Sequence, residues 1–152
     1  MAKKIGLGVL AVVAVLLLVI ATRPAHFRIE RSAQISAPPA VVFSLVNDFR
    51  QWPKWSPWEK VDPAMKKTFD GPATGQGASY AWAGNSKAGE GRMTILESKP
   101  SEEVSIQLEF VKPFAATNRA TFTMSPSAQG TEVHWIMEGD NGFAAKAFSL
   151  FM

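Results

Sequence analysis

The chain has 152 residues, enough for one domain and little more, because domains usually run to roughly 100–200 residues. Its formal net charge of +3 comes from Lys and Arg scattered singly among Asp and Glu, which argues against a nucleic-acid partner. The chain contains no cysteine, so disulfides, thiolate metal sites and cysteine catalysis are excluded.

The first predicted element is an apolar segment, residues 5–22, which follows a short basic tail, residues 1–4, and precedes a linker, residues 23–26. As a helix it would be about 27 Å long, close to the hydrocarbon thickness of about 30 Å. A cleaved signal peptide is the alternative, but it needs a shorter apolar stretch and small residues at the cleavage site, where Arg23 and Pro24 stand. We therefore expect an uncleaved single-pass membrane anchor.

Basic residues at the two ends of this segment bear on its orientation. Lys3 and Lys4 precede it, whereas Arg23, Arg28 and Arg31 follow it, so the positive-inside rule favours neither side strongly. A short amino-terminal tail usually stays in the cytoplasm, and on this ground we expect an extracytoplasmic domain.

The predicted domain covers residues 27–152 and begins with a strand at residues 27–35, where apolar and polar residues alternate with a period of two. The apolar face of this strand consists of Phe27, Ile29, Ala33 and Ile35. A serine and two prolines then precede an apolar run with helical spacing, which predicts a short helix starting near Pro38.

A segment dense in tryptophan and proline follows at residues 52–58. Its prolines exclude a regular strand and break any long helix, so we expect a second short helix that turns into a loop. Trp52, Trp55 and Trp58 are spaced by three residues and would line one side of a helical turn. Packing against the edge of a sheet is their ordinary role. The alternative is that one or two of them wall a ligand entrance.

Short extended runs separated by turns fill most of the remaining sequence. Each run offers one apolar face, which predicts an antiparallel sheet with a single inner side. A glycine-rich stretch at residues 71–77 lacks the Lys-Ser/Thr ending of a phosphate-binding loop and predicts a turn between strands. The predicted strands are residues 66–69, 79–83, 89–97, 104–110, 119–124 and 132–137.

The last predicted element is a helix that starts at a turn formed by residues 140–142. No helix-ending signal precedes Met152, so we expect either a native chain that continues or a truncated copy. The residues at helical spacing are Phe143, Ala144, Ala147, Phe148, Leu150 and Phe151.

This order of elements resembles the SRPBCC (START-like) superfamily, which includes polyketide cyclases/dehydrases and lipid-transport proteins. The resemblance covers residues 27–152 and is closest at residues 35–43, 49–63 and 130–133. It implies an α+β helix-grip fold, in which a seven-stranded curved antiparallel sheet surrounds a long carboxy-terminal helix and two short helices close one end. A cavity lies between sheet and helix in that family. The final helix predicted here, about ten residues, is about half the usual length.

Inward-facing residues of such a sheet are core by default, but one helix fills a curved sheet incompletely and leaves an apolar cavity. The residues predicted to bind a ligand there are Trp55, Trp58, Tyr80, Trp82, Met93, Ile95, Phe110, Phe122, Met124 and Trp135, and Met137 faces the same way.

Polar residues give little support for catalysis, for a metal or for another cofactor. His26 lies beside the predicted anchor and His134 lies on the polar face of its strand, so we expect no zinc site. Glu97 shares strand parity with Met93 and Ile95 and would be an acid inside the cavity, although a charge at the surface is its ordinary role.

We therefore expect a membrane-anchored domain that binds a hydrophobic small molecule of the lipid, isoprenoid or polyketide kind. Two alternatives stay open. One is a cyclase or dehydratase that acts on a hydrophobic substrate and needs buried acid or base groups. The other is a non-catalytic membrane protein that binds another protein through an exposed apolar patch.

Overall fold

The computed structural model describes residues 14–22, 25–140 and 142. Arg28–Gly139 form one compact unit, and the described residues on either side of it belong to a second unit. Residues 14–22 are helical. They are the described part of the predicted anchor, whose residues 5–13 lie outside the described residues. In the part of the chain that the structure describes, no helix is both long enough and apolar enough to cross a membrane.

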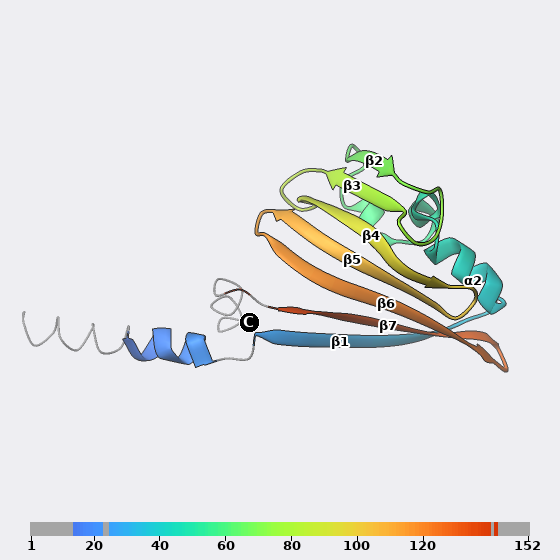
Figure 1. Ribbon diagram of the computed structural model, residues 1–152, viewed down its shortest axis with the longest axis horizontal. Helices are drawn as coiled ribbons and strands as arrows, with labels where there is room; N and C mark the ends of the chain where they lie inside the picture. The colour runs from blue at the N-terminus through green and yellow to red at the C-terminus, as the bar shows by residue number, and fades with distance from the viewer. Residues whose placement is uncertain (1–13, 23–24, 141, 143–152) are drawn as a thin grey trace, which may run out of the picture. The chain divides into compact units, whose positions relative to one another are not determined.

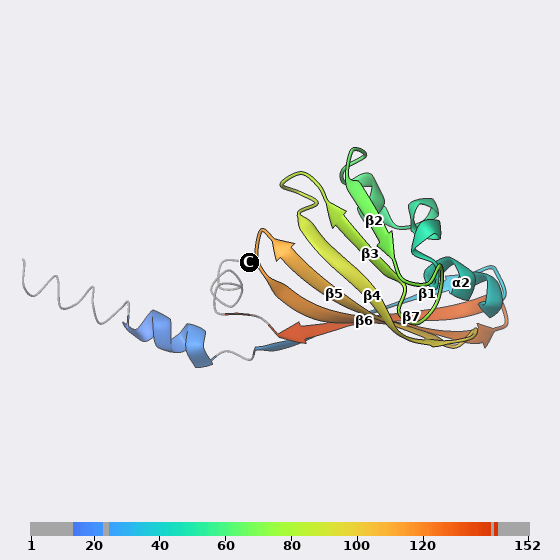
Figure 2. The same ribbon diagram turned by 45° about the horizontal axis from the view of Figure 1, so that its top comes forward.

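Seven strands form one sheet in the order β1-β7-β6-β5-β4-β3-β2, and the pairs from β2 to β7 are antiparallel (Figure 1). Figure 2 shows that the sheet twists and curves along its length. The strands are β1 (His26–Ile35), β2 (Lys66–Asp70), β3 (Ser79–Ala83), β4 (Glu90–Lys99), β5 (Glu103–Lys112), β6 (Ala116–Ser127) and β7 (Gly130–Asp140).

Three short helices lie between β1 and β2: α2 (Pro39–Val46), η1 (Phe49–Lys54) and η2 (Pro57–Lys60), of which the last two are 3-10 helices. Pro39 occupies the first turn of α2, where a missing N–H costs nothing. The carboxylate of Asp48 caps η1 by accepting from the Arg50 N–H at 2.9 Å. α2 contacts β5, β6 and η1, so these helices cover one end of one sheet face.

Alternate residues of β3 to β7 point toward the face that α2 covers, which we call the inner face. The core forms where this face meets α2 and η1, and burying its apolar side chains is the main stabilising contribution to the fold. The buried residues of this core are Val42, Val46, Phe49, Trp52, Ala78, Tyr80, Met93, Ile95, Val104, Ile106, Leu108, Ala120, Phe122 and Met124.

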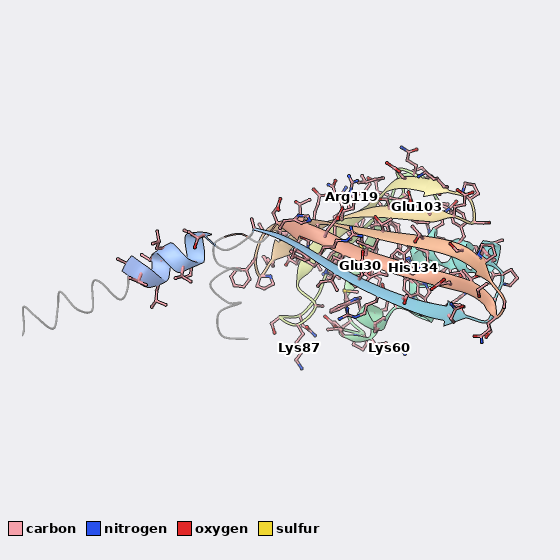
Figure 3. All side chains as sticks on the ribbon, turned by 90° about the horizontal axis from the view of Figure 1, so that it is seen from below. Glu30, Lys60, Lys87, Glu103, Arg119 and His134 are labelled. Carbon is pink, nitrogen blue, oxygen red and sulfur yellow. The ribbon has the colours of Figure 1, made fainter. Side chains whose placement is uncertain are left out.

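The outer face carries the polar side chains, as the alternation predicts. Figure 3 labels Glu103, Arg119 and His134, which come from β5, β6 and β7 and have outer-face parity. His134 Nε2 lies 3.3 Å from Glu132 Oε1 on the same strand. The prediction that His134 lies on the polar face of its strand is therefore confirmed.

The first predicted strand exists, but the prediction that it is half-buried is wrong. Ile29 and Ile35 are 40% and 39% exposed, and only Phe27 of the four predicted apolar residues is half-buried. β1 is an edge strand of the sheet, whereas α2 contacts the central strands β5 and β6. Alternating apolar and polar residues therefore predict the strand correctly, but they do not predict whether another element covers its apolar face.

The ordinary role predicted for Glu97, a charge at the surface, is confirmed, and the alternative of an acid inside the cavity is wrong because a β-bulge changes the strand parity. The register of β4 against β5 shifts between Ile95 and Glu97, so Leu96 has no partner on β5. After the bulge, Ser98 pairs with the inward-facing Val104, while the Glu97 side chain is 56% exposed. Glu97 is therefore a surface charge rather than an acid inside a cavity.

The predicted carboxy-terminal helix lies outside the described residues. We predicted that the turn before this helix begins at residue 140. That boundary is wrong, because Asp140 is still part of β7. The turn predicted at residues 71–77 is confirmed: β2 ends at Asp70, β3 begins at Ser79, and Gly71, Gly75 and Gly77 have positive φ.

Candidate functional site

A chain of aromatic rings crosses the inner face at its β2–β5 side. Phe69 stacks on Tyr80 with 5.2 Å between ring centroids, and Tyr80 stacks on Trp82 at 6.2 Å. The edge of Trp82 then meets Phe110 at 5.8 Å. The register explains the order, since Phe69, Tyr80 and Met93 are neighbours across three strands. Such rings provide a broad, rigid apolar surface.

The same chain continues into the short helices. The ring centroid of Phe49 lies 5.9 Å from that of Tyr80 and 5.3 Å from that of Trp52. The Trp52 and Trp55 centroids are 4.8 Å apart. Both tryptophans meet the edge of Phe122 on β6, at 6.4 and 6.1 Å. Their indole N–H groups donate to the carbonyl oxygens of Val46 and Leu45, each at 3.1 Å. These contacts fix η1 on the sheet.

A glycine makes room for Trp82. Gly91 pairs with Trp82 across β3 and β4, and a Cβ atom at Gly91 would lie 2.5 Å from Cη2 and Cζ2 of the indole and from the Glu109 carbonyl oxygen. The Trp82 N–H donates to the Ala88 carbonyl oxygen at 3.0 Å, which fixes the ring orientation. Any side chain larger than hydrogen would displace this ring.

The structure divides the predicted ligand-binding residues into two groups. Five of them are buried in the core, where Ile95 is only 1% exposed, and their burial contributes to the stability of the fold. Three others are half-buried at the margin of that core, where the helices do not fully cover the sheet. The core group is Tyr80, Met93, Ile95, Phe122 and Met124; the marginal group is Trp82, Phe110 and Trp135, with Met137 beside it.

The two remaining predicted residues lie on the helical segment rather than on the sheet. Trp55 is 37% exposed and touches the sheet only through Phe122 among its aromatic contacts. Trp58 is 73% exposed on η2, so its indole faces outward. The structure therefore brings Trp82, Phe110 and Trp135 onto one face and leaves Trp58 apart from them.

The inner face of β3 to β7 carries no charged side chain among the described residues. Its register positions hold apolar residues, glycines and four polar residues, Tyr80, Ser98, Asn118 and Thr131. Ser98 donates to Asn47 Oδ1 at 2.7 Å, and Thr131 donates to the Ala37 carbonyl oxygen at 2.6 Å. A wall of this composition suits a neutral, largely apolar ligand.

A buried polar cluster closes the β2–β3 edge of this face. The Tyr80 hydroxyl donates to Glu59 Oε1 at 3.0 Å, and the Lys67 ammonium contacts the other Glu59 oxygen. The Glu59 side chain is only 6% exposed. Sequence reasoning missed this cluster, because Glu59 lies in the irregular segment 21 residues before Tyr80 and no local pattern links them.

The cluster changes the titration of Tyr80. Burial raises the pKa of the Tyr80 phenol above its ordinary value of 10.0, and the charge of Glu59 and its hydrogen bond raise it further. The phenol is therefore a neutral donor near pH 7 and stabilises the ionised carboxylate. With both Glu59 oxygens engaged, the cluster joins η2 to the sheet rather than offering a base to a substrate.

Asp62 holds the neighbouring turn. Its two carboxylate oxygens accept from the backbone N–H groups of Ala64 at 3.0 Å and Asn85 at 2.7 Å. The residue is 9% exposed. It thus joins the turn before β2 to the β3–β4 hairpin, which gives the Asp62-Pro63 end of the tryptophan-rich stretch a structural role.

Two open surface hollows lie away from the inner face. One, of about 470 Å³, lies beside α2 and η1 and is lined by Asn47, Gln51 and Lys54 among others. The other, of about 530 Å³, lies between the β3–β4 and β5–β6 hairpins. None of the ten residues predicted to bind a ligand lines either hollow. The candidate site is accordingly a wall of the sheet, and the described residues alone do not enclose it.

A family model described as "Polyketide cyclase / dehydrase and lipid transport" matches residues 26–152. The match begins at the first residue of β1 and covers the whole sheet. A search of curated proteins found no match.

Solved structures share the fold at low sequence identity. Protein MLL2253 from Mesorhizobium loti has a TM-score of 0.60 and 17% identity over 81% of this chain and 84% of that chain. A protein from Rhizobium leguminosarum has a TM-score of 0.58 and 12% identity over 85% and 88% of the two chains. Protein CV1439 from Chromobacterium violaceum has a TM-score of 0.55 and 19% identity over 84% and 88%.

Proposed function

Since the chain belongs to the polyketide cyclase/dehydrase and lipid transport family, we propose that its domain binds a hydrophobic small molecule on the inner face of the sheet, next to a membrane anchor. The ligand would be of the lipid, isoprenoid or polyketide kind.

The observation that carries this proposal is the composition of the inner face. Trp82, Phe110 and Trp135 are half-buried there, and in the register of β3 to β7 no charged residue pairs with an inner-face residue among the described positions. Apolar rings left incompletely covered favour contact with an apolar molecule, because burying that area removes it from water.

Features of one end of the sheet support a position next to a bilayer. The β5–β6 hairpin lies at the same end of the sheet as Arg28, because Arg28 bonds to Glu138 and Glu138 pairs with Arg119 near the start of β6; Arg28 follows the predicted anchor along the chain. Phe114 in this hairpin is 67% exposed and Val111 is 59% exposed, with Lys112 between them. Exposed apolar residues beside a cation suit the interface of an anionic membrane.

The membrane part of the proposal otherwise rests on the sequence of residues 5–22. A short tail that contains Lys3 and Lys4 favours an amino terminus in the cytoplasm, and we propose an extracytoplasmic domain on that ground. Tethering would keep the open face near the bilayer, where poorly soluble molecules are concentrated.

A binding role is better supported than a cyclase or dehydratase role. Catalysis by proton transfer needs an acid or base that faces the substrate. Glu97 is on the outer face, and the Glu59 carboxylate is engaged by Tyr80 and Lys67. The described part of the inner face therefore offers contact area rather than a pair of converging catalytic groups.

Native mass spectrometry of the full-length protein, purified in detergent, tests the proposal. We expect a stoichiometric apolar molecule that stays bound in the gas phase and is recovered by solvent extraction. Repeated recovery of empty protein from cells with a full complement of lipids would contradict it.

A further inference from the structure

One polar group on the inner face stands apart from the others. Of the four polar residues there, Tyr80, Ser98 and Thr131 have hydrogen-bond partners, whereas Asn118 Oδ1 is buried and has none among the described residues. A buried amide oxygen without a partner loses its hydrogen bonds to water and gains nothing in return. Such a group calls for a specific explanation.

The surroundings of Asn118 are apolar and small. It pairs with Leu108 on β5 and with Gly139 on β7, and its inner-face neighbours along β6 are Ala116 and Ala120. Gly139, which lies opposite Asn118 on β7, has no side chain, and the side chains of both alanines are short. The amide therefore lies in a part of the wall built from small residues, so that little side-chain bulk separates it from a molecule on the inner face.

The position of Asn118 also belongs to the candidate site. Its cross-strand row continues through Leu108 to Met93 and Tyr80. Phe110 and Met137 occupy the adjacent rows and are half-buried. A single polar group among half-buried apolar residues is the usual composition of a small-molecule site, in which the polar group fixes orientation.

We propose that the Asn118 carboxamide is the polar recognition point of this site and that Oδ1 accepts a hydrogen bond from the hydroxyl of an otherwise apolar ligand. The inference rests on the proposed binding function and deepens it by naming the ligand class, an alcohol or phenol. A carboxylate fits poorly, because the inner face of β3 to β7 offers no cation among the described residues, and Lys67, which pairs with Trp82 from β2, is already engaged by Glu59. A hydrocarbon would leave Oδ1 unpaired.

The test compares two probes that differ only in the donor group, 1-naphthol and 1-methoxynaphthalene, by isothermal titration calorimetry with the full-length protein in detergent. We expect the wild type to bind the phenol about fivefold to tenfold more tightly than the ether, as the loss of one hydrogen bond predicts. Asn118→Leu should remove this preference. Thr121→Val, on the outer face of the same strand, should preserve it.

A stability measurement separates recognition from a structural role. Because Asn118→Leu removes an unpaired buried polar group, the variant should unfold at the same temperature as wild type or higher. A marked loss of stability would mean that Asn118 has a structural partner and would overturn the inference.

The binding outcomes distinguish the two proposals. Equal affinity of the wild type for both probes would overturn the role of Asn118 and leave the binding function standing. Failure of the wild type to bind either probe would count against the binding function and the inference together.

Discussion

The Thr131 hydroxyl donates a hydrogen bond to the carbonyl oxygen of Ala37 at 2.6 Å, and Thr131 is completely buried. This contact joins two of the three stretches that carry the family resemblance, residues 35–43 and 130–133. Gly130 reinforces the junction, since a Cβ atom there would lie 2.4 Å from the Ile35 carbonyl oxygen. These two stretches, far apart in the sequence, therefore meet at one place in the fold.

Thr131→Val should therefore destabilise the domain by about 1–3 kcal/mol, because it leaves the partly buried Ala37 carbonyl oxygen without its donor. Urea unfolding measures the effect. Ser127→Ala is the matched control, since its hydroxyl donates to Gln34 at an exposed position and should change stability by less than about 0.5 kcal/mol. Equal losses in the two variants would contradict this account.

Gly91→Ala should cost about 1–3 kcal/mol by forcing Trp82 and the Glu109 carbonyl away from the new methyl group. In a Trp82→Ala background the indole part of this clash is absent, so the same change should cost less. A double-mutant cycle in urea measures the difference. Identical effects of the glycine substitution in both backgrounds would show that Trp82 does not pack on Gly91.

Tyr80 is the single tyrosine of the chain, so its ionisation can be followed directly by tyrosinate absorbance. The folded protein should ionise above the ordinary value of 10.0, and the urea-unfolded protein near it. The neutral phenol is favoured in the folded state, so its stability contribution is complete below the unfolded pKa and is lost as pH rises toward the folded pKa.

Two variants test the cause of this shift. Tyr80→Phe should remove the alkaline loss of stability that Tyr80 produces, and Glu59→Gln should bring the folded pKa of Tyr80 closer to its ordinary value. An unchanged Tyr80 titration in Glu59→Gln would mean that burial alone sets the pKa.

Ligand retention should depend on Trp135, which is half-buried on the inner face, and not on the exposed Trp58. We expect Trp135→Ala to weaken retention of the co-purifying molecule about tenfold, which corresponds to about 1.4 kcal/mol. Trp58→Ala, at a position that is 73% exposed, should leave it unchanged. Quantitative extraction from equal amounts of each purified variant measures this. The reverse order of effects would place the ligand on η2.

The absence of cysteine makes the proposed contact between the β5–β6 hairpin and a membrane easy to probe. Phe114→Cys and Ser127→Cys, at opposite ends of the sheet, can each carry one environment-sensitive fluorophore. In vesicles that contain anionic lipid, the label at 114 should report an apolar surrounding through a shift to shorter wavelength, and the label at 127 should not. Similar spectra at both sites would contradict a membrane-facing hairpin.

The sequence predicted the sheet well because strand patterning is local. Val104, Ile106 and Leu108 alternate as expected and all are buried, and the family resemblance is confirmed by the model that matches residues 26–152. The site was less predictable. The contact between Glu59 and Tyr80 depends on how an irregular segment folds back, and the exposure of Ile29 depends on which strands the helices cover. Asn118 stood just before the predicted strand at residues 119–124 and so was not considered.

The unpaired Leu96 has a consequence for how substitutions and deletions in β4 should be interpreted. Leu96 changes the parity of the strand. Up to Ile95 the odd-numbered residues face the core, whereas after the bulge Ser98 faces it. If Leu96 paired with Ser105 instead of bulging, Glu97 would pair with Val104 and its carboxylate would face the core; deleting Leu96 would leave Glu97 opposite Ser105 on the outer face. The unpaired state of Leu96 therefore keeps the Glu97 carboxylate off the apolar face of the sheet.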